Sequence, residues 1–525
     1  MKSTFTTFAY GEDRLTSSIA LGLARGQVQG RISDAVRAKL TRSQASVHQM
    51  ANGNVPVYGI NTGFGPLCTT TISAEQTKLL QRNLLISHAV GVGTPIAEET
   101  ARLMMVLKLQ ALAQGYSGIA PATMDRILWL LDQRITPVVP CQGSVGASGD
   151  LAPLAHLFLP LIGEGEVYLK GESRPTKEVL AEHGLTPLEL GPKEGLGLIN
   201  GTQFIAAHAV QLVERLHHCL SQADVIGAMM IEGLQGSIKP FTEALHQLRP
   251  YPGNLHVADR LRQLLAGSEI LEDHIDCDRV QDPYSLRCMP QVHGASRTAW
   301  LHLRELVEIE LNAVTDNPVV LDDETAISGG NFHGQPLAMA IDYACLAAAE
   351  LGNISDRRIY LALEGGHGIP QLLMEDTGVN SGYMILQYTT AALVSENKTL
   401  CFPASADSIP TSLGQEDHVS MGSISGRKAM QVVGNLEKIL AIELLTAAQA
   451  FEFRKPLQSG PILNVIHEKL REKVSFAEVD RVFAQDIRLA TELIQEAKLL
   501  QWTTEVAESR QLPYRATWES EFEIY

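Results

Sequence analysis

The most distinctive run of the sequence is GSVGASGDLAPLAH, residues 143–156. At its centre Ala147, Ser148 and Gly149 carry almost no side-chain bulk, so the backbone can approach itself closely there. Asp150 follows at the position expected for a helix N-cap, because apolar residues at helical spacing come directly after it. The sequence therefore predicts a tight turn that leads into a short helix.

The same three residues can also make a reactive group from the backbone. If the amide nitrogen of Gly149 attacks the carbonyl carbon of Ala147, a five-membered ring closes, and loss of water from Ser148 leaves a methylene conjugated to a carbonyl. Such a group is a strong carbon electrophile, and the positive end of the following helix favours negative charge that develops on it. The ordinary alternative is a turn, since Ala-Ser-Gly is a common tripeptide.

Composition limits the class of protein. The chain has 525 residues, 45% of them apolar, which is enough for more than one packed region. Only 19% are charged, against about a quarter in ordinary soluble domains, so we expect other subunits to cover part of the surface. The net charge of −17 argues against nucleic acid and against anionic membranes as partners.

Two further features favour a cytoplasmic protein. The first residues, MKSTFTTFAYGEDR, lack the apolar core of a secretory signal, and no uncharged apolar stretch reaches the roughly 18 residues of a membrane span. The seven cysteines are scattered and odd in number, which is typical of reduced thiols rather than of a disulfide framework.

Helical spacing dominates the chain. In residues 429–453 apolar side chains recur at steps of three and four, and similar runs cover roughly 296–314, 336–363 and 383–397. Earlier, Thr94-Pro95 is expected to open a helix whose apolar residues cover most of its circumference. These patterns predict largely buried helices, the later ones long enough for a bundle.

Only residues 163–172 alternate and turn like a β-hairpin. We therefore expect a mainly α fold. It begins with a mostly helical N-terminal domain over residues 1–204, which carries the small β element, and continues as a bundle of long helices with C-terminal helices over residues 205–525.

Several loops and helix ends present polar or aromatic side chains. Tyr58 lies in the glycine-rich loop 57–66, which is either an active-site lid or an ordinary surface loop. His88 ends an apolar segment, where a histidine is usually a satisfied core residue. Asn200 precedes an apolar helical run and can serve as its N-cap.

Residues 281–287 are more informative. Asp282 can cap a helix that Pro283 opens, which places Tyr284 and Arg287 on one helix face. A guanidinium beside a phenol can hold a carboxylate and bring a proton-transfer group close to it. The alternative for Arg287 is an ion pair at the surface.

Two later turns also gather polar groups. Phe332 lies in the glycine-rich turn 328–334, beside an asparagine and a histidine. Gln415 and Glu416 begin a run of one carboxamide, two carboxylates and one imidazole. The alternative for Glu416 and Asp417 is the solvated start of a helix.

Other chemistries are not favoured. The acidic run 272–278 is too crowded for a closed metal site and lacks a second cluster. The Ser-x-x-Lys at 425–428 lacks the motifs that accompany it in β-lactamases. The glycines of 195–201 have the wrong spacing for a dinucleotide loop.

These motifs resemble those of the aromatic amino acid ammonia-lyases, from about residue 50 to about residue 460. The resemblance implies that Ala147, Ser148 and Gly149 form a 4-methylidene-imidazole-5-one group (MIO) autocatalytically, with no metal, pyridoxal phosphate or nucleotide. The five matching runs are YGINTGFG at 58–65, ASGD at 147–150, NGTQ at 200–203, YSLR at 284–287 and QEDH at 415–418.

Two positions resemble the histidine branch of that family. His88 and Glu416 can both hydrogen-bond an imidazole, whereas a phenyl ring would leave them unpaired. The implied reaction is deamination of L-histidine to trans-urocanate and ammonia, the first step of histidine degradation. Arg287 would hold the substrate carboxylate, while His88 and Glu416 would hold its imidazole.

The resemblance implies roles for the other site residues as well. Tyr58 is the first candidate to remove the β-proton, and Glu416 and Tyr284 are the alternatives. The residues expected to bind the substrate or the MIO oxygen, or to pack beside them, are Asn200, Gln281, Phe332 and Gln415.

The family also implies an ammonia-lyase/fumarase-like architecture and a homotetramer with active sites shared between subunits. The competing interpretations are a tyrosine or phenylalanine ammonia-lyase, an MIO-dependent aminomutase, and a non-catalytic helical scaffold. His88 and Glu416 argue against the first. The presence of Tyr58, Ser148 and Arg287 together with Glu416 argues against the last.

Overall fold

The computed structural model describes residues 7–65, 72–275, 279–322 and 325–525. Pro66 of the predicted lid loop, two of the cysteines, part of the acidic run and the first six residues therefore lie outside the described residues. Helices hold 61% of the chain and strands 7%, which confirms the mainly α fold class. The five described cysteines, Cys141, Cys219, Cys288, Cys345 and Cys401, are free thiols.

The chain divides into two compact units by its internal contacts. Unit 1 comprises Met1–Gln211, Leu303–Asp342 and Pro403–Arg427, and unit 2 comprises Leu212–His302, Tyr343–Phe402 and Lys428–Tyr525. The division predicted between residues 204 and 205 stays a prediction.

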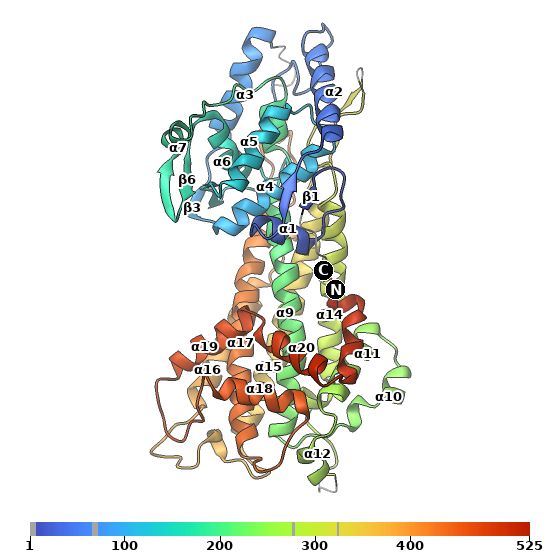
Figure 1. Cartoon of the computed structure of the whole chain (residues 1–525), viewed down its shortest axis with the longest axis vertical. Coiled ribbons are helices and arrows are strands. Elements are labelled where there is room, and N and C mark those ends of the chain that lie inside the picture. The colour runs from blue at the N-terminus through green and yellow to red at the C-terminus, as the bar shows by residue number, and fades with distance from the viewer. Residues whose placement is uncertain (1–6, 66–71, 276–278, 323–324) are drawn as a thin grey trace. The chain divides into compact units, whose positions relative to one another are not determined.

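Unit 1 contains a central apolar helix, α4 (Glu98–Ala113), which is buried throughout residues 103–113 as predicted. The helix begins later than predicted, because Thr94-Pro95 belongs to strand β3 (Val92–Pro95), which pairs with β5 (Pro140–Gln142). Figure 1 shows α1 (Ser17–Ala24) and α5 (Pro121–Asp132) beside α4, on which both pack. In addition, α3 (Ala74–His88), α6 (Leu151–Phe158) and α8 (Glu194–Ile199) pack against one another. The other helices of the unit are α2 (Asp34–Ala51) and α7 (Thr176–Glu182).

The predicted hairpin is present and is formed by β6 (Glu166–Leu169) and β7 (Glu172–Pro175). Its turn residues, Lys170 and Gly171, both have positive φ. The remaining strands form short pairings: β4 (Thr136–Pro137) on β6, β1 (Thr7–Ala9) parallel to β2 (Gln29–Arg31), and β8 (Val319–Val320) on β9 (Ala326–Ile327).

The predicted long helices are confirmed, with boundaries a few residues away from those expected; they run side by side in Figure 1. Their bounds are α9 (Gln203–Gly233), α14 (Met289–Glu310), α15 (Gln335–Leu363) and α17 (Gly422–Glu452). In unit 2 polar side chains link the four into a ring: Trp300 donates to the Val213 carbonyl (2.8 Å), Ser296 to the Ala347 carbonyl (3.0 Å), Arg215 to Glu437 (2.7 Å), and Arg358 to Glu443.

One of these long helices, α15, is long and apolar enough to cross a membrane by length and composition alone. However, 67% of its most apolar window is buried, as in the core helix of a soluble protein.

Shorter helices complete unit 2. They are α10 (Glu243–Gln247), α11 (Pro252–Leu264), α12 (Glu269–Asp273), α13 (Tyr284–Arg287), α16 (Met384–Leu400), α18 (Pro461–Arg471), α19 (Phe483–Gln495) and α20 (Lys498–Ser509). The 3-10 helices of unit 1 are η2 (Leu159–Ile162), η5 (Ala404–Ala406) and η6 (Ser412–Gly414), and those of unit 2 are η3 (Lys239–Phe241), η4 (Gln371–Leu373), η7 (Pro513–Glu519) and η8 (Glu521–Glu523).

A network of buried charges lies inside unit 2. Asp224 accepts hydrogen bonds from His293 (2.8 Å) and Arg297 (2.6 Å) and pairs with Arg260 (2.9 Å). Glu523 pairs with both arginines, at 2.8 and 3.2 Å. Burial would raise the pKa of Asp224, but Arg297, His293 and Arg260 hold it well below its usual range. The cations of this network are thus neutralised where water cannot screen them.

Candidate active site

The turn at residues 147–149 is held against the segment that precedes α9. Gly149 has φ +74° and forms a parallel bridge with Gly201. The Asp150 amide donates to the Gly201 carbonyl (2.7 Å), and the Gly201 amide donates to the Ser148 carbonyl (3.3 Å). A Cβ atom on Gly149 would lie 2.1 Å from the Gly201 oxygen, so this position requires glycine.

A third segment, before α17, holds the other side of the turn. Ser420 donates to the Gly146 carbonyl (3.2 Å), and the Met421 amide donates to the Val145 carbonyl (2.9 Å). Ala147 is buried in a small cluster with Val419 and Met421. Segments about 50 and about 270 residues away along the chain therefore fix the conformation of the turn.

Asp150 stands at the N-cap position of α6, as predicted, but its side chain does not cap that helix. Its carboxylate instead accepts hydrogen bonds from the amides of Phe204 and Ile205, both 3.0 Å, in the first turn of α9. Burial raises the pKa of Asp150 to about 7, and the two amide hydrogen bonds oppose that rise. The N-cap position of Asp150 is thus confirmed, but its side chain does not bond the adjacent helix, because its partners come from a distant one.

Ser148 points its hydroxyl at Glu416, to which it donates a hydrogen bond of 2.9 Å. The second carboxylate oxygen of Glu416 accepts hydrogen bonds from Thr411 (2.8 Å) and Ser412 (3.0 Å). Since α17 begins only at Gly422, Glu416 is not the solvated start of a helix. The carboxylate is thus fixed in place beside the serine.

His88 is the last residue of α3 and is half-buried rather than enclosed in the core. Its Nδ1 lies 3.0 Å from the Ser87 hydroxyl. Burial lowers the pKa of His88, while the Leu84 carbonyl and the Glu416 carboxylate act in the opposite direction. The imidazole of His88 is therefore within electrostatic range of Glu416.

Three more predicted site residues lie in unit 1. Tyr58 is half-buried, with its ring edge-on to Phe64 at 6.5 Å, and its hydroxyl accepts a hydrogen bond from the Gly65 amide (3.3 Å). Phe332 is half-buried and Gln415 is exposed.

Asn200 does not cap α9, because that helix begins at Gln203 and Asp150 binds its first amides. The Asn200 carbonyl accepts a hydrogen bond from Lys108 (2.6 Å), and its side-chain oxygen is buried without a hydrogen-bond partner in the described part of the chain.

Lys108 was not among the predicted site residues. It is 1% exposed, and burial lowers its pKa to about 7, with Asp316 opposing and Lys193 reinforcing the shift. The sequence does distinguish Lys108, because it is the single charged residue between positions 103 and 113 of an apolar helix.

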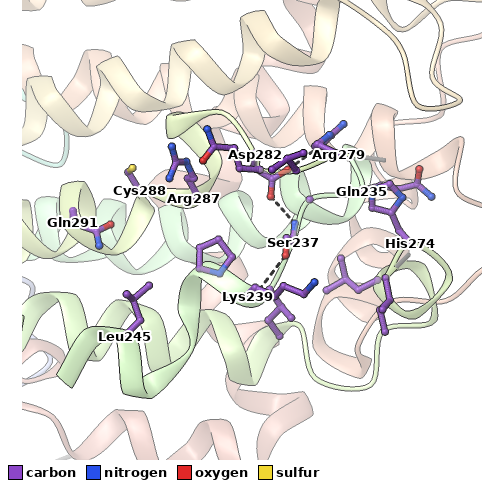
Figure 2. Close-up of a pocket in the computed structure, with 17 residues that line it drawn as sticks. Gln235, Ser237, Lys239, Leu245, His274, Arg279, Asp282, Arg287, Cys288 and Gln291 are labelled. Carbon is purple, nitrogen blue, oxygen red and sulfur yellow. Dashed lines mark hydrogen bonds and ion pairs between the residues drawn. The ribbon is translucent and has the colours of Figure 1, made fainter. Parts of the chain in front are cut away.

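Gln281, Tyr284 and Arg287 lie in unit 2, where Gln281 and Arg287 line a cavity of about 470 Å³ (Figure 2). Arg287 lies over the Tyr284 ring, 4.6 Å from its centroid, which agrees with their predicted shared face on α13. Asp282 does not cap α13; it accepts from the Ser237 amide (2.6 Å) and from Arg279 (2.9 Å).

Arg287 also has one donor without a partner in the described residues. Its Nε is buried and has no hydrogen-bond partner among the residues that the structure describes. Such a donor is suited to an anionic group such as a carboxylate. A buried donor without a partner does not favour the alternative in which Arg287 forms an ion pair at the surface.

The predicted site residues thus fall into two groups. Unit 1 brings together the 147–149 turn, Glu416, His88 and the Asn200 segment, and also contains Tyr58, Phe332 and Gln415. Unit 2 contains Gln281, Tyr284 and Arg287.

Comparison with known proteins gives a consistent result. The family model of the aromatic amino acid lyases matches residues 15–472. The chain is 46% identical to a histidine ammonia-lyase of Myxococcus xanthus over 93% of this chain and 96% of that protein, and 49% identical to one of Sorangium cellulosum over 88% and 92%.

Solved structures show the same fold. The histidine ammonia-lyase of Trypanosoma cruzi superposes with a TM-score of 0.89 at 38% identity, over 99% of this chain and 98% of that one. The tyrosine aminomutase of Streptomyces globisporus also superposes with a TM-score of 0.89, at 36% identity over 95% and 99%.

Proposed function

This chain belongs to the aromatic amino acid lyase family, and we infer that it catalyses the deamination of L-histidine to trans-urocanate and ammonia. Curated relatives 46–49% identical over most of the chain are histidine ammonia-lyases. The observation that carries the proposal is the 2.9 Å hydrogen bond between Ser148 and Glu416. It places a carboxylate able to bind an imidazole beside the serine expected to form the electrophile.

We propose that Ala147, Ser148 and Gly149 form MIO. The residues fit this group, because Gly149 has no Cβ and approaches Gly201 closely, while Ala147 is buried and Ser148 is held on Glu416. When formed, MIO supplies a carbon electrophile that takes up the substrate amino group or, in the alternative mechanism, its imidazole ring. No metal, pyridoxal phosphate or nucleotide is needed in this proposal.

The chain's own side chains would bind and deprotonate the substrate. Arg287 would hold the carboxylate through its unused donor, and His88 and Glu416 would hold the imidazole. Tyr58 remains the first candidate to accept the β-proton at its phenol oxygen, followed by Glu416 and Tyr284.

The remaining site residues would surround the substrate. The side-chain amide of Asn200, whose oxygen is buried and unpartnered in the described residues, would bind the substrate or the MIO oxygen. Gln281 would serve in the same way, and Phe332 and Gln415 would lie against the substrate.

We further propose a cytoplasmic homotetramer with active sites shared between subunits. Within unit 2, α15 exposes a stripe of residues at steps of three and four, a spacing typical of a helix that packs on another helix. Three of them are large and about half exposed: Tyr343 (48%), Leu346 (53%) and Tyr360 (50%). Large half-exposed side chains of this kind on one helix face favour subunit contact.

Sharing of sites predicts that two inactive variants rescue each other. Ser148→Ala and Arg287→Met are each expected to lose nearly all activity, whereas tetramers assembled from both contain sites with a wild-type copy of each residue. Random mixing gives such sites a share of about one quarter, so co-expression should restore up to about a quarter of wild-type turnover. Urocanate formation by the co-purified protein measures this.

The control for that experiment is the two variants purified separately and mixed after folding, which should stay inactive. Native mass should correspond to four chains of 57.1 kDa each. Co-expressed protein no more active than either variant alone would show that each subunit builds its own site.

Replacing Glu416 tests the substrate assignment. Glu416→Gln should lower kcat/KM for L-histidine about 100-fold, the equivalent of one charge-assisted hydrogen bond of about 3 kcal/mol. Its activity on L-phenylalanine should not fall, because a phenyl ring makes no such bond. Steady-state assays on both amino acids measure the ratio.

The matched control is Asp417→Asn, which alters the neighbouring exposed carboxylate and should change kcat/KM less than about twofold. If Glu416→Gln lowers the rate on both amino acids equally, Glu416 acts in proton transfer rather than in recognition of the imidazole.

The experiment that tests the proposed function is an ultraviolet assay of the purified protein with L-histidine, L-tyrosine and L-phenylalanine in parallel. Urocanate from histidine alone supports the proposal. Cinnamate or coumarate would assign the chain to a phenylalanine or tyrosine lyase, and a β-amino acid found by product analysis would assign it to an aminomutase. Lack of turnover with all three would leave the non-catalytic scaffold.

A further inference from the structure

Lys108 is a buried lysine of unit 1 to which the proposed function gives no role. It is 1% exposed in the middle of α4, a helix whose other buried side chains are apolar apart from Thr100 and Gln110. Burial of an ammonium group costs free energy unless its donors are satisfied. The partners of Lys108 therefore indicate what the side chain does.

The short contact of Lys108 is to a peptide group rather than to a carboxylate. Its Nζ donates to the Asn200 carbonyl at 2.6 Å and to the Gln203 side-chain oxygen at 3.5 Å. The charged groups that act on it are Asp316, Lys193 and Asp150. Of these, Asp316 is already paired with Lys193 at 2.7 Å.

The peptide that Lys108 binds is the one that touches the reactive turn. The Asn200 carbonyl and the Gly201 amide belong to the same peptide group, and that amide donates to the Ser148 carbonyl at 3.3 Å. A donor on the carbonyl of a peptide polarises the group and strengthens its N–H as a donor. Lys108 is thus linked to the Ser148 oxygen through a single peptide.

We propose that Lys108 is a positioning residue for the reaction, acting through the Asn200–Gly201 peptide on the carbonyl oxygen of Ser148. The inference rests on the proposed function, in which that carbonyl remains conjugated to the methylene derived from Ser148. Electron density that moves onto the Ser148 oxygen is stabilised by the Gly201 amide, and Lys108 both orients and strengthens that donor.

Two variants of Lys108 and one matched control test the proposal. Lys108→Met removes the donor but keeps an unbranched side chain, and Lys108→Arg keeps both donor and charge. Gln110→Met removes another buried polar side chain of α4, one that bonds Gly11, Asp13 and Asn312 instead of the reactive turn. All three are compared with the wild type for intact mass, kcat and KM on L-histidine.

In Lys108→Met we expect kcat to fall about 10- to 100-fold, somewhat less than the loss of a direct oxyanion donor, with KM within about threefold of wild type. The mass should still show the loss of two waters, so that the fall is in turnover and not in formation of the group. The kcat of Lys108→Arg should be at least about tenfold higher than that of Lys108→Met. The kcat of Gln110→Met should stay within about threefold of wild type.

Two results would overturn the proposal: Lys108→Met with wild-type kcat, or Lys108→Arg no more active than Lys108→Met. Equal losses in Lys108→Met and Gln110→Met would assign Lys108 to packing alone and overturn it as well. An inactive wild-type protein contradicts the proposed function instead, so the two failures are distinguishable.

Discussion

Ser148→Ala is expected to abolish both the mass deficit and the activity of the protein. The wild-type chain should weigh two water molecules less than its sequence predicts, because ring closure and dehydration of Ser148 each release one. Alanine has no hydroxyl to lose, so no methylene forms. Turnover should then fall by roughly 10⁴-fold or more, as when a covalent catalyst loses its reactive group. Intact-protein mass spectrometry and the urocanate assay measure the two effects.

The control is Ser144→Ala, which removes another hydroxyl from the same loop, one that donates to Asp150 at 3.4 Å. That variant should still show the mass deficit, because Ser144 contributes no atom to the ring. Substantial activity in Ser148→Ala would contradict the proposed electrophile, whatever the mass shows.

Asp224→Asn is expected to cause the largest loss of stability in the chain. Asp224 is fully buried, with Arg297 at 2.6 Å and Arg260 at 2.9 Å, and an amide cannot neutralise either cation. Breaking a buried charge network by removing one partner typically costs about 3–5 kcal/mol. Chemical denaturation at matched protein concentration measures the difference in the free energy of unfolding.

The pH dependence of that loss has a definite sign. Because the folded pKa of Asp224 lies below its ordinary value of 3.8, its stabilisation is fully present above that pH and is lost only as the pH falls through the folded pKa. The penalty of Asp224→Asn should therefore be constant between about pH 6 and pH 9.

An exposed ion pair supplies the matched control for Asp224. Asp125, 46% exposed and bonded to Arg37, should cost less than about 1 kcal/mol when it is replaced by asparagine. A penalty for Asp224→Asn as small as that of Asp125→Asn would show that the arginines find other partners.

The sequence predicted those features that depend on neighbours along the chain. The periodicity of 429–453 and 336–363 identified α17 and α15, and the alternation at 163–172 identified the hairpin. The shared face of Tyr284 and Arg287 was also predictable, because a spacing of three residues sets it within one helical turn.

Features that depend on distant segments were not predictable in the same way. The carboxylate of Asp150 bonds amides more than 50 residues away, and the local pattern offered only the adjacent helix as its partner. The Ser148–Glu416 bond spans 268 positions. The resemblance named both residues, but only the folded chain brings the hydroxyl and the carboxylate together.

The role inferred for Lys108 was hidden for a related reason. In an apolar helix a single lysine is easily taken for one that extends its ammonium group to solvent. Its significance lies in the carbonyl it meets, which belongs to a residue 92 positions further along the chain.

Three separate stretches of chain form the turn that carries Ser148. They are the stretch around Asp150, the stretch around Gly201 and the stretch that contains Ser420. If ring closure needs that conformation, the loss of two waters shows that a chain has folded at least once. A chain that has once folded so that the three stretches meet stays lighter by two waters after it unfolds. A chain that has never folded in this way keeps the full mass that its sequence predicts. In a denatured or aggregated sample, the proportion of lighter chains would then count those that had passed through the native state.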